Sequence, residues 1–210
     1  MDKPGEKPVK KRAVIFDYGG VLVKTVDYSP RHAWDDRLGL TRGSVERVVH
    51  GSQSWLDVMS GRISSADYWS DVAGQLHLNT AEVARLARDF YSGDRLDEII
   101  AAYIRRLREA GHTVGLLSNA SPALRGELVE LGVIDLFDPL VISCEIGVLK
   151  PNPGAYQAVL SRLGRPASEV IFIDDMPANI EGARALGIHG ILYTAGMDLS
   201  AALAALLQTG

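Results

Sequence analysis

The sequence predicts an α/β protein: a doubly wound, Rossmann-like parallel sheet with an all-helical cap inserted after its first strand. Three observations lead to this prediction. Short apolar runs that suit buried strands recur along the chain, helical stretches separate the last four of them, and about 70 residues of helical pattern follow the first. The runs predict strands, their alternation with helices predicts a parallel sheet, and the long helical segment predicts an insertion.

The five predicted strands are nearly continuous runs of apolar residues, without the alternation of a half-exposed strand. Continuous runs are typical of strands that helices cover on both faces. The runs are AVIF (13–16), TVGLLS (113–118), LVIS (140–143), VIFID (170–174) and GILYT (190–194).

Helices are predicted between these strands because apolar residues recur there at helical intervals. In the segment 96–111 they stand at positions 96, 99, 100, 103, 104 and 107, and Gly111 suits a helix C-cap. Segments 121–132, 154–164 and 179–187 also end in glycine. This alternation of strand and helix predicts a doubly wound sheet.

The insertion is predicted to be wholly helical. Ser64 with Asp67, and Asn79 with Glu82, have the spacing of capping boxes at helix starts. The first strand releases the chain at the carboxyl edge of the sheet, so the inserted unit should lie over that edge. The predicted organisation is a flexible tail (1–11), the α/β core (12–24 and 95–210) and the helical cap (25–94).

Composition restricts the classes of partner and environment. The net charge is −4 and the one basic cluster is terminal, at residues 3–12, so no nucleic-acid partner is expected. No window approaches 18 uninterrupted apolar residues, so no membrane span is expected. The single cysteine, Cys144, cannot form an intrachain disulfide, which fits a cytoplasmic protein, and we interpret it as a small core residue.

Polar residues follow the predicted strands at their carboxyl ends, where open α/β sheets bind ligands. Three acids, one lysine, one hydroxyl and one amide should therefore share one edge of the sheet. They are Asp17 after the first strand, Ser118 and Asn119 at the second, Lys150 after the third, and Asp174 and Asp175 at the fourth.

This set of residues predicts a phosphate site beside a divalent cation. Clustered carboxylates need positive charge nearby, and hard oxygen ligands favour Mg²⁺. The Ser118 hydroxyl and the N–H groups at the start of the following helix suit an anion. One carboxylate would then be free to attack the phosphate.

Four segments, in order and spacing, resemble the four motifs of the haloacid dehalogenase-like (HAD) hydrolase superfamily. They are FDYGGVL (16–22), LLSNAS (116–121), GVLKPNP (147–153) and VIFIDDMPANIEGA (170–183), and the resemblance covers about residues 12–195. The details look most like the phosphatase branch with a helical cap after the first motif. That branch includes the N-terminal phosphatase domain of soluble epoxide hydrolase and sugar-phosphate phosphatases.

The resemblance implies a role for each matching residue. Asp17 would be the nucleophile of a Mg²⁺-dependent phosphomonoesterase and would form an aspartyl-phosphate. Lys150 would neutralise nucleophile and phosphate, while Ser118 and Asn119 would bind substrate. Mg²⁺ would be held by Asp17, the main-chain carbonyl of Gly19, and Asp175, with Asp174 in support and Asn179 orienting the group. The substrate would be a small soluble phosphate ester, and family analogy makes a homodimer possible.

Gly19 departs from the family pattern, because most of its phosphatases carry a second Asp there that protonates the leaving group. Such acid–base help is worth about 10²–10⁴-fold in rate. The substrate could have a leaving group that needs little protonation, such as an anomeric or acyl phosphate. A cap residue such as Asp27 or His32 could replace the acid, or catalysis could be reduced.

Two alternative functions remain open from the sequence. A 2-haloacid dehalogenase acting through an aspartyl ester also lacks the second Asp, but it needs no metal and therefore no paired acids such as Asp174 and Asp175. A catalytically weak module that binds a phosphorylated ligand or a protein partner would bind metal and phosphate without turnover.

The cap offers few residues with a specific signal for substrate contact. Arg31 and His32 follow the first motif closely, where the chain enters the cap, and are candidates. The cap aromatics Trp34, Trp55, Tyr68 and Trp69 could line a substrate pocket, but we favour helical-bundle core for them. We interpret His50, which has no metal-ligand spacing, as surface or ordinary packing.

Overall fold

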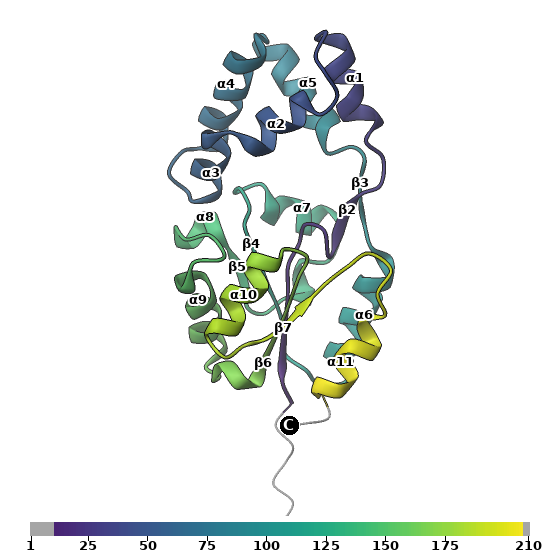
Figure 1. Ribbon diagram of the computed structural model, residues 1–210, viewed down its shortest axis with the longest axis vertical. Helices are drawn as coiled ribbons and strands as arrows, with labels where there is room; N and C mark the ends of the chain where they lie inside the picture. Colours follow the sequence, from purple (N-terminus) through teal and green to yellow (C-terminus); the bar gives the residue numbers. More distant parts are fainter. Residues whose placement is uncertain (1–10, 208–210) are drawn as a thin grey trace, which may run out of the picture.

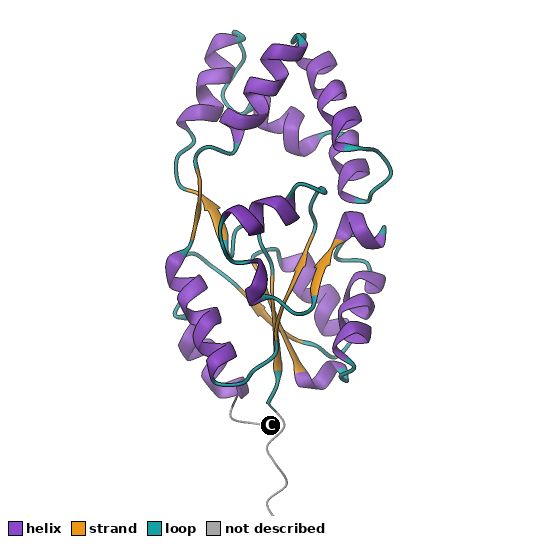
Figure 2. Ribbon diagram, turned by 180° about the vertical axis from the view of Figure 1, so that it is seen from behind, coloured by secondary structure: helices purple, strands orange, loops and turns teal. Residues whose placement is uncertain are grey.

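The computed structural model describes residues 11–207 and divides into an α/β unit and a helical unit (Figure 1). Two neighbouring strands join these units, and the same connection is seen from behind in Figure 2. Ten of the eleven residues of the predicted N-terminal tail, residues 1–10, lie outside the described part. Within residues 11–207, no helix combines the length and the apolar character that crossing a bilayer requires.

A five-stranded parallel sheet forms the centre of the α/β unit, in the order β5-β4-β1-β6-β7. Its strands are β1 (Ala13–Phe16), β4 (Val114–Ser118), β5 (Leu140–Ile142), β6 (Val170–Asp174) and β7 (His189–Leu192). Each predicted strand is therefore present. The second starts one residue later than predicted, the third ends one residue earlier, and the last starts one residue and ends two residues earlier. With β1 in the middle, the residue that follows β1 lies between the ends of β4 and β6.

Alternate side chains of β1 enter two separate cores. Val14 and Phe16 pack in one core, and Ala13 and Ile15 pack in the other. Five helices cover the two faces (Figures 1 and 2): α6 (Glu98–Glu109), α7 (Leu124–Glu130) and α11 (Leu199–Leu207) on the first, α9 (Pro153–Leu163) and α10 (Pro177–Ala185) on the second. Burial on both faces explains the continuous apolar runs, and it confirms the doubly wound fold class.

The helical unit has its own apolar core. Its helices are α1 (Ser29–Arg37), α2 (Ser44–Gly51), α3 (Gln53–Met59), α4 (Ser65–Leu76) and α5 (Thr80–Phe90). Both predicted capping boxes are present, at Ser64 and Asn79. Trp34 and Tyr68 are buried in this core and Trp69 packs against it, as predicted, whereas Trp55 packs against it and also lines a cleft.

A two-stranded antiparallel ribbon connects the units: β2 (Val23–Thr25) pairs with β3 (Asp94–Leu96). The sequence does not predict this ribbon, because each strand has three residues and no hairpin turn joins them. A second contact lies at α8 (Ser143–Ile146), where the buried Ser143 hydroxyl donates to the carbonyl of Met59 at 2.6 Å. The ribbon and this hydrogen bond both attach the helical unit to the α/β unit.

Candidate active site

The carboxyl ends of β1, β4 and β6 bring the predicted polar residues together. Phe16, the last residue of β1, pairs with Leu116 of β4 and with Ile173 of β6. The next residue, Asp17, therefore lies level with Leu117 and Asp174, beside the carboxyl ends of both flanking strands. The order of the strands, rather than proximity in the chain, creates this site.

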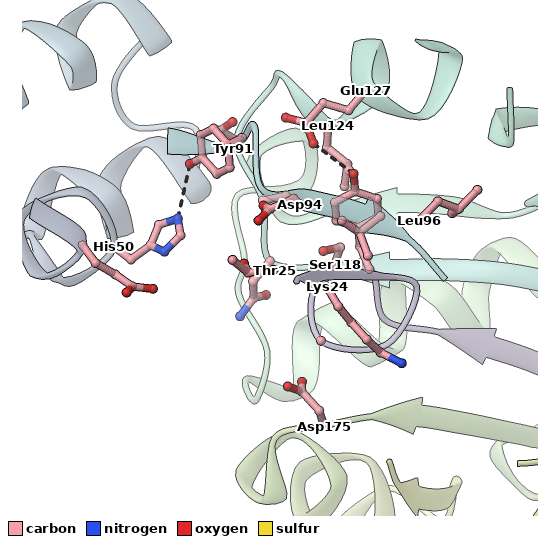
Figure 3. A pocket seen from close by; sticks show the side chains of 18 of the residues that line it. Lys24, Thr25, His50, Tyr91, Asp94, Leu96, Ser118, Leu124, Glu127 and Asp175 are labelled. Atoms are coloured by element: carbon pink, nitrogen blue, oxygen red, sulfur yellow. Dashed lines mark hydrogen bonds between the residues drawn. The ribbon is translucent and has the colours of Figure 1, made fainter. Parts of the chain in front are cut away.

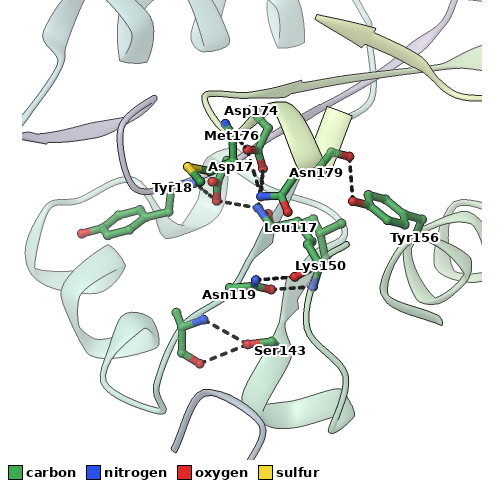
Figure 4. A network of polar contacts seen from close by, with 11 residues as sticks. Asp17, Tyr18, Leu117, Asn119, Ser143, Lys150, Tyr156, Asp174, Met176 and Asn179 are labelled. Carbon is green, nitrogen blue, oxygen red and sulfur yellow. Dashed lines mark hydrogen bonds and ion pairs between the residues drawn. The ribbon is translucent and has the colours of Figure 1, made fainter. Parts of the chain in front are cut away.

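Lys150 is the centre of a buried charge network at this edge (Figure 4). Its ammonium lies 2.9 Å from Oδ1 of Asp17 and 2.7 Å from Oδ2 of Asp174, and it donates to the Leu117 carbonyl at 2.9 Å. The Lys150 side chain is 1% exposed. One cation thus compensates two carboxylates that burial would otherwise disfavour.

Asp174 is fully occupied by protein donors. Its two oxygens accept from Lys150, from the Met176 N–H at 2.8 Å, and from the Asn179 amide at 3.0 Å on each side. Asp17, by contrast, makes its two contacts through one oxygen. Its Oδ1 accepts from the Tyr18 N–H at 2.6 Å and pairs with the Lys150 ammonium. Within residues 11–207, Oδ2 of Asp17 therefore has no hydrogen-bond partner and is available for chemistry.

Asp17, Asp174 and Asp175 fit a divalent cation. One oxygen of each lies within 4.8 Å of the others, but those of Asp174 already accept protein donors, so Asp17 and Asp175 are the acids that could ligate directly. Burial raises the pKa of Asp17 to about 7, with Lys150 opposing and Asp174 reinforcing the shift. Burial also raises the pKa of Asp175, and the charge of Asp174 adds to this effect. A cation among these oxygens would favour the ionised carboxylates, and an all-oxygen donor set suits Mg²⁺.

Two glycines form the turn after Asp17, and they differ in what they permit. Gly20 has a φ of +73°, and a Cβ there would collide with the Asp175 carboxylate. Gly19 has an ordinary φ, and a Cβ there would meet nothing within 4 Å. The structure therefore requires glycine at position 20 but leaves room for a side chain at position 19.

Ser118 and Asn119 share a place in the cleft but differ in their contacts with the protein. Both line the cleft above the sheet edge, and Ser118 is 3% exposed. The Asn119 amide donates to the Lys150 carbonyl at 2.9 Å and accepts from the Lys150 N–H at 2.8 Å. These contacts indicate that Asn119 positions the loop carrying Lys150; its predicted contact with substrate remains a prediction.

The cleft lies between the α/β unit and the helical unit and has a volume of about 1290 Å³ (Figure 3). Its wall includes Trp55, for which pocket lining is the less favoured interpretation from the sequence. It also includes residues to which the sequence assigns no role in the site: Tyr18, His50, Tyr91, Leu124 and Glu127. The interpretation of His50 as ordinary packing is incomplete, because it packs against Trp55 and Phe90 but also faces the cleft. No local signal marks these residues, since they occupy ordinary helix and loop positions.

The cap candidates from the sequence analysis are placed as follows. Arg31 lines the cleft, but its buried guanidinium binds the Phe90 carbonyl, Glu46, Thr25 and Asp94, so it fastens the helices to the ribbon. Asp27 and His32 are not among the lining residues of the described chain. Asp27 instead accepts from the Ser29 N–H at the start of α1, and His32 stacks on Tyr28.

Replacement of Lys150 by Met is expected to destabilise the protein by about 3 kcal/mol in metal-free buffer, because it leaves two buried carboxylates without their cation. Mg²⁺ should restore part of this loss, since it neutralises the same oxygens. Urea unfolding with EDTA and with Mg²⁺ measures both effects.

Lys24→Met is the matched control, because Lys24 also joins a carboxylate, Asp97, at 2.5 Å, but is 25% exposed. Solvent screens such a pair, so we expect a loss below about 1 kcal/mol with no dependence on Mg²⁺. Equal losses of unfolding free energy in the two variants would contradict the conclusion that Lys150 is the centre of the buried charge network.

Comparison with known proteins agrees with this geometry. The model of the haloacid dehalogenase-like hydrolases, described as a hydrolase family, matches residues 11–187. A solved structure of a predicted HAD-like family hydrolase from Porphyromonas gingivalis is 26% identical, with a TM-score of 0.77, and the match covers 95% of this chain and 99% of that one.

Curated relatives have different printed activities. Sesquiterpene phosphatase astK of Aspergillus oryzae is 28% identical, over 87% of this chain and 90% of the relative. (S)-2-haloacid dehalogenase 1 of a Pseudomonas species is 29% identical, over 86% and 83%. Acyl-CoA dehydrogenase family member 10 of Mus musculus is 29% identical over 95% of this chain, which spans only 20% of that protein. The family match over most of the chain, with the acids and the lysine gathered at one sheet edge, shows that the chain belongs to the haloacid dehalogenase-like hydrolases.

Proposed function

We propose that the protein is a Mg²⁺-dependent phosphatase that hydrolyses a small phosphate monoester through an aspartyl-phosphate on Asp17. The observation that carries this proposal is the cluster of Asp17, Asp174 and Asp175, whose oxygens lie within 4.8 Å of one another. Metal-independent ester chemistry at Asp17 has no need for this additional negative charge. The relative named as a phosphatase supports the same proposal.

Asp17, Asp175 and the Gly19 carbonyl would hold the metal, with Asp174 in support. Asp174 already accepts four hydrogen bonds, so its part is to orient Lys150 and Asn179. Within residues 11–207, no backbone donor reaches the Gly19 carbonyl, so it is free to act as a ligand. When bound, Mg²⁺ supplies positive charge to the carboxylates and to the phosphoryl oxygens.

Asp17 would attack phosphorus through Oδ2, the oxygen without a partner among the described residues. The new O–P bond forms as the P–O bond to the leaving group breaks, and the departing alkoxide takes its proton from water. Water then hydrolyses the aspartyl-phosphate to phosphate and free Asp17. Lys150 favours the ionised nucleophile and offsets the phosphoryl charge. The Ser118 hydroxyl would donate to a phosphoryl oxygen, so that preorganised electrostatics carries most of the catalysis.

Residues 25–94 would act as a cap that excludes water and selects the substrate. The aromatic residues that they contribute to the cleft support this role. Closure over the site would depend on the ribbon and on the contact between Ser143 and Met59. A cytoplasmic location and a homodimer stay predictions from the sequence.

The purified protein is expected to release phosphate from p-nitrophenyl phosphate with Mg²⁺ and to lose this activity with EDTA. This ester has a good leaving group, so the missing acid at position 19 should matter least. The dehalogenase alternative, which the similarity to (S)-2-haloacid dehalogenase 1 supports, predicts the opposite pattern: halide released from a 2-haloacid in EDTA. Halide release without metal, together with inert phosphate esters, would overturn the proposal.

A further inference from the structure

The part of the cleft away from Asp17 and Asp175 is lined by aromatic and aliphatic side chains, together with charged ones that are paired or exposed. Trp55 and Tyr91 come from the helical unit, Leu96 from the ribbon, and Tyr18 and Leu124 from the α/β unit. Figure 3 shows His50, Tyr91 and Leu124 on the side of the cleft opposite Asp175. A substrate whose phosphate lies at Asp17 would extend its leaving group toward these rings and aliphatic chains.

The strong cations of this wall are already paired with acids. The Arg31 guanidinium lies 2.8 Å from Glu46 and 3.0 Å from Asp94, and its side chain is 5% exposed. Lys24 is bound to Asp97. Arg88, which also lines the cleft, is exposed, so solvent screens its charge. Among the described residues, the wall therefore lacks a buried, unpaired cation that could receive a second anionic group of the substrate.

His50 and Glu127 each already have a tyrosine hydroxyl as a hydrogen-bond partner. Burial and the nearby Arg31 lower the pKa of His50 to about 4, so its imidazole is neutral near pH 7. The Tyr91 hydroxyl lies 3.3 Å from His50 Nε2. Burial raises the pKa of Glu127, and this carboxylate accepts from the Tyr18 hydroxyl at 3.1 Å. Neither side chain is an obvious partner for a charged leaving group of either sign.

We infer that the cleft selects phosphate monoesters of uncharged, largely apolar alcohols, and that Trp55 determines this selectivity. The inference rests on the proposed phosphatase function and specifies its substrate class. Aryl or bulky aliphatic groups would cover the aromatic wall, whereas a carboxylate or a second phosphate would be desolvated without a partner. An ammonium group would find Glu46 and Asp94 paired with Arg31 and Glu127 bonded to the Tyr18 hydroxyl, while Glu130 is exposed and screened by solvent.

Binding to the Asp17→Asn protein tests the substrate class apart from turnover. Calorimetry with Mg²⁺ compares 2-naphthyl phosphate with 4-carboxyphenyl and 4-(aminomethyl)phenyl phosphate, and inorganic phosphate is the reference for the shared group. We expect 2-naphthyl phosphate to bind at least about tenfold more tightly than either charged ester. Equal binding, tighter binding of a charged ester, or an affinity no better than that of phosphate would overturn the inference.

Trp55→Ala in the same background should weaken 2-naphthyl phosphate binding by about tenfold and leave inorganic phosphate binding unchanged. Trp69→Ala is the matched control, because both tryptophans are partly buried, pack on the same core and contact the Tyr68 ring, but only Trp55 lines the cleft. Equal weakening of 2-naphthyl phosphate binding in the two variants would show that Trp55 does not determine the selectivity. A wild-type protein that prefers the neutral ester in binding but turns over no ester would contradict the phosphatase and not the selectivity of the cleft.

Discussion

The Asp17→Asn variant is expected to lose phosphatase activity by about 10⁴-fold or more while remaining folded, because an amide cannot form the aspartyl-phosphate. The oxygen of the substituted amide would keep the contacts that Oδ1 of Asp17 now makes with the Tyr18 N–H and Lys150. The variant therefore removes the reacting oxygen with little disturbance of the geometry. Steady-state phosphate release with Mg²⁺ measures the loss.

The same variant should be more stable than the wild-type protein in metal-free buffer near pH 8. Because burial raises the pKa of Asp17 from 3.8 to about 7, the folded state disfavours the charge that the unfolded state carries freely. The penalty begins as pH rises above the unfolded pKa and is largest above the folded one, where a neutral amide avoids it. Urea unfolding in EDTA at pH 5 and pH 8 checks the sign: the advantage of the variant should grow with pH.

Asp27→Asn is the matched control for the loss of phosphatase activity in Asp17→Asn. Asp27 is an exposed acid ten residues further along and is a candidate, from the sequence, to replace the missing proton donor. It accepts from the Ser29 N–H and does not line the cleft, so its loss should leave turnover within about twofold. Activity retained in Asp17→Asn would contradict the assignment of the nucleophile, whereas activity lost in Asp27→Asn would contradict the placement of Asp27 outside the site.

The gathering of acids and lysine at one edge could be predicted because its signals are local. An apolar run that ends in a polar residue marks the carboxyl end of a buried strand, as at Asp17, Ser118 and Asp174. A parallel sheet brings all such ends to the same edge. The pattern required no knowledge of the strand order, although that order decides which residues become neighbours.

The wall of the cleft could not be predicted, because its residues depend on how the helical unit sits over the sheet. His50 lies on α2, Tyr91 directly follows α5, and Glu127 lies on α7, each within an ordinary amphipathic pattern. The sequence makes Arg31 a candidate for substrate contact only because it follows the first motif closely. Its partners Glu46, Phe90 and Asp94 are 15, 59 and 63 residues away, so its bonds within the protein become visible only in the fold.

Gly19→Asp is expected to raise kcat for phosphate esters of ordinary alcohols by about 10²-fold or more, because a carboxylic acid two residues after the nucleophile could protonate the leaving alkoxide. Glycine is not required there for conformation, since its φ is ordinary and a Cβ would enter open space. For p-nitrophenyl phosphate, whose leaving group needs no proton, the change should stay within about threefold. A series of aryl and alkyl phosphates of increasing leaving-group pKa measures the difference as a shallower dependence on leaving-group basicity.

Two further variants separate proton transfer from side-chain bulk. Gly19→Asn introduces a side chain with the shape of Asp but without its acidity, so it should leave the leaving-group dependence of the wild-type protein unchanged. Gly20→Ala should lose activity on every ester, because φ is +73° and its Cβ would displace the Asp175 carboxylate. If Gly19→Asp changes no rate in the series while Mg²⁺-dependent turnover persists, protonation of the leaving group does not limit this enzyme. Glycine at position 19 would then be suited to a substrate whose leaving group departs without a proton, and it would not indicate a weakened active site.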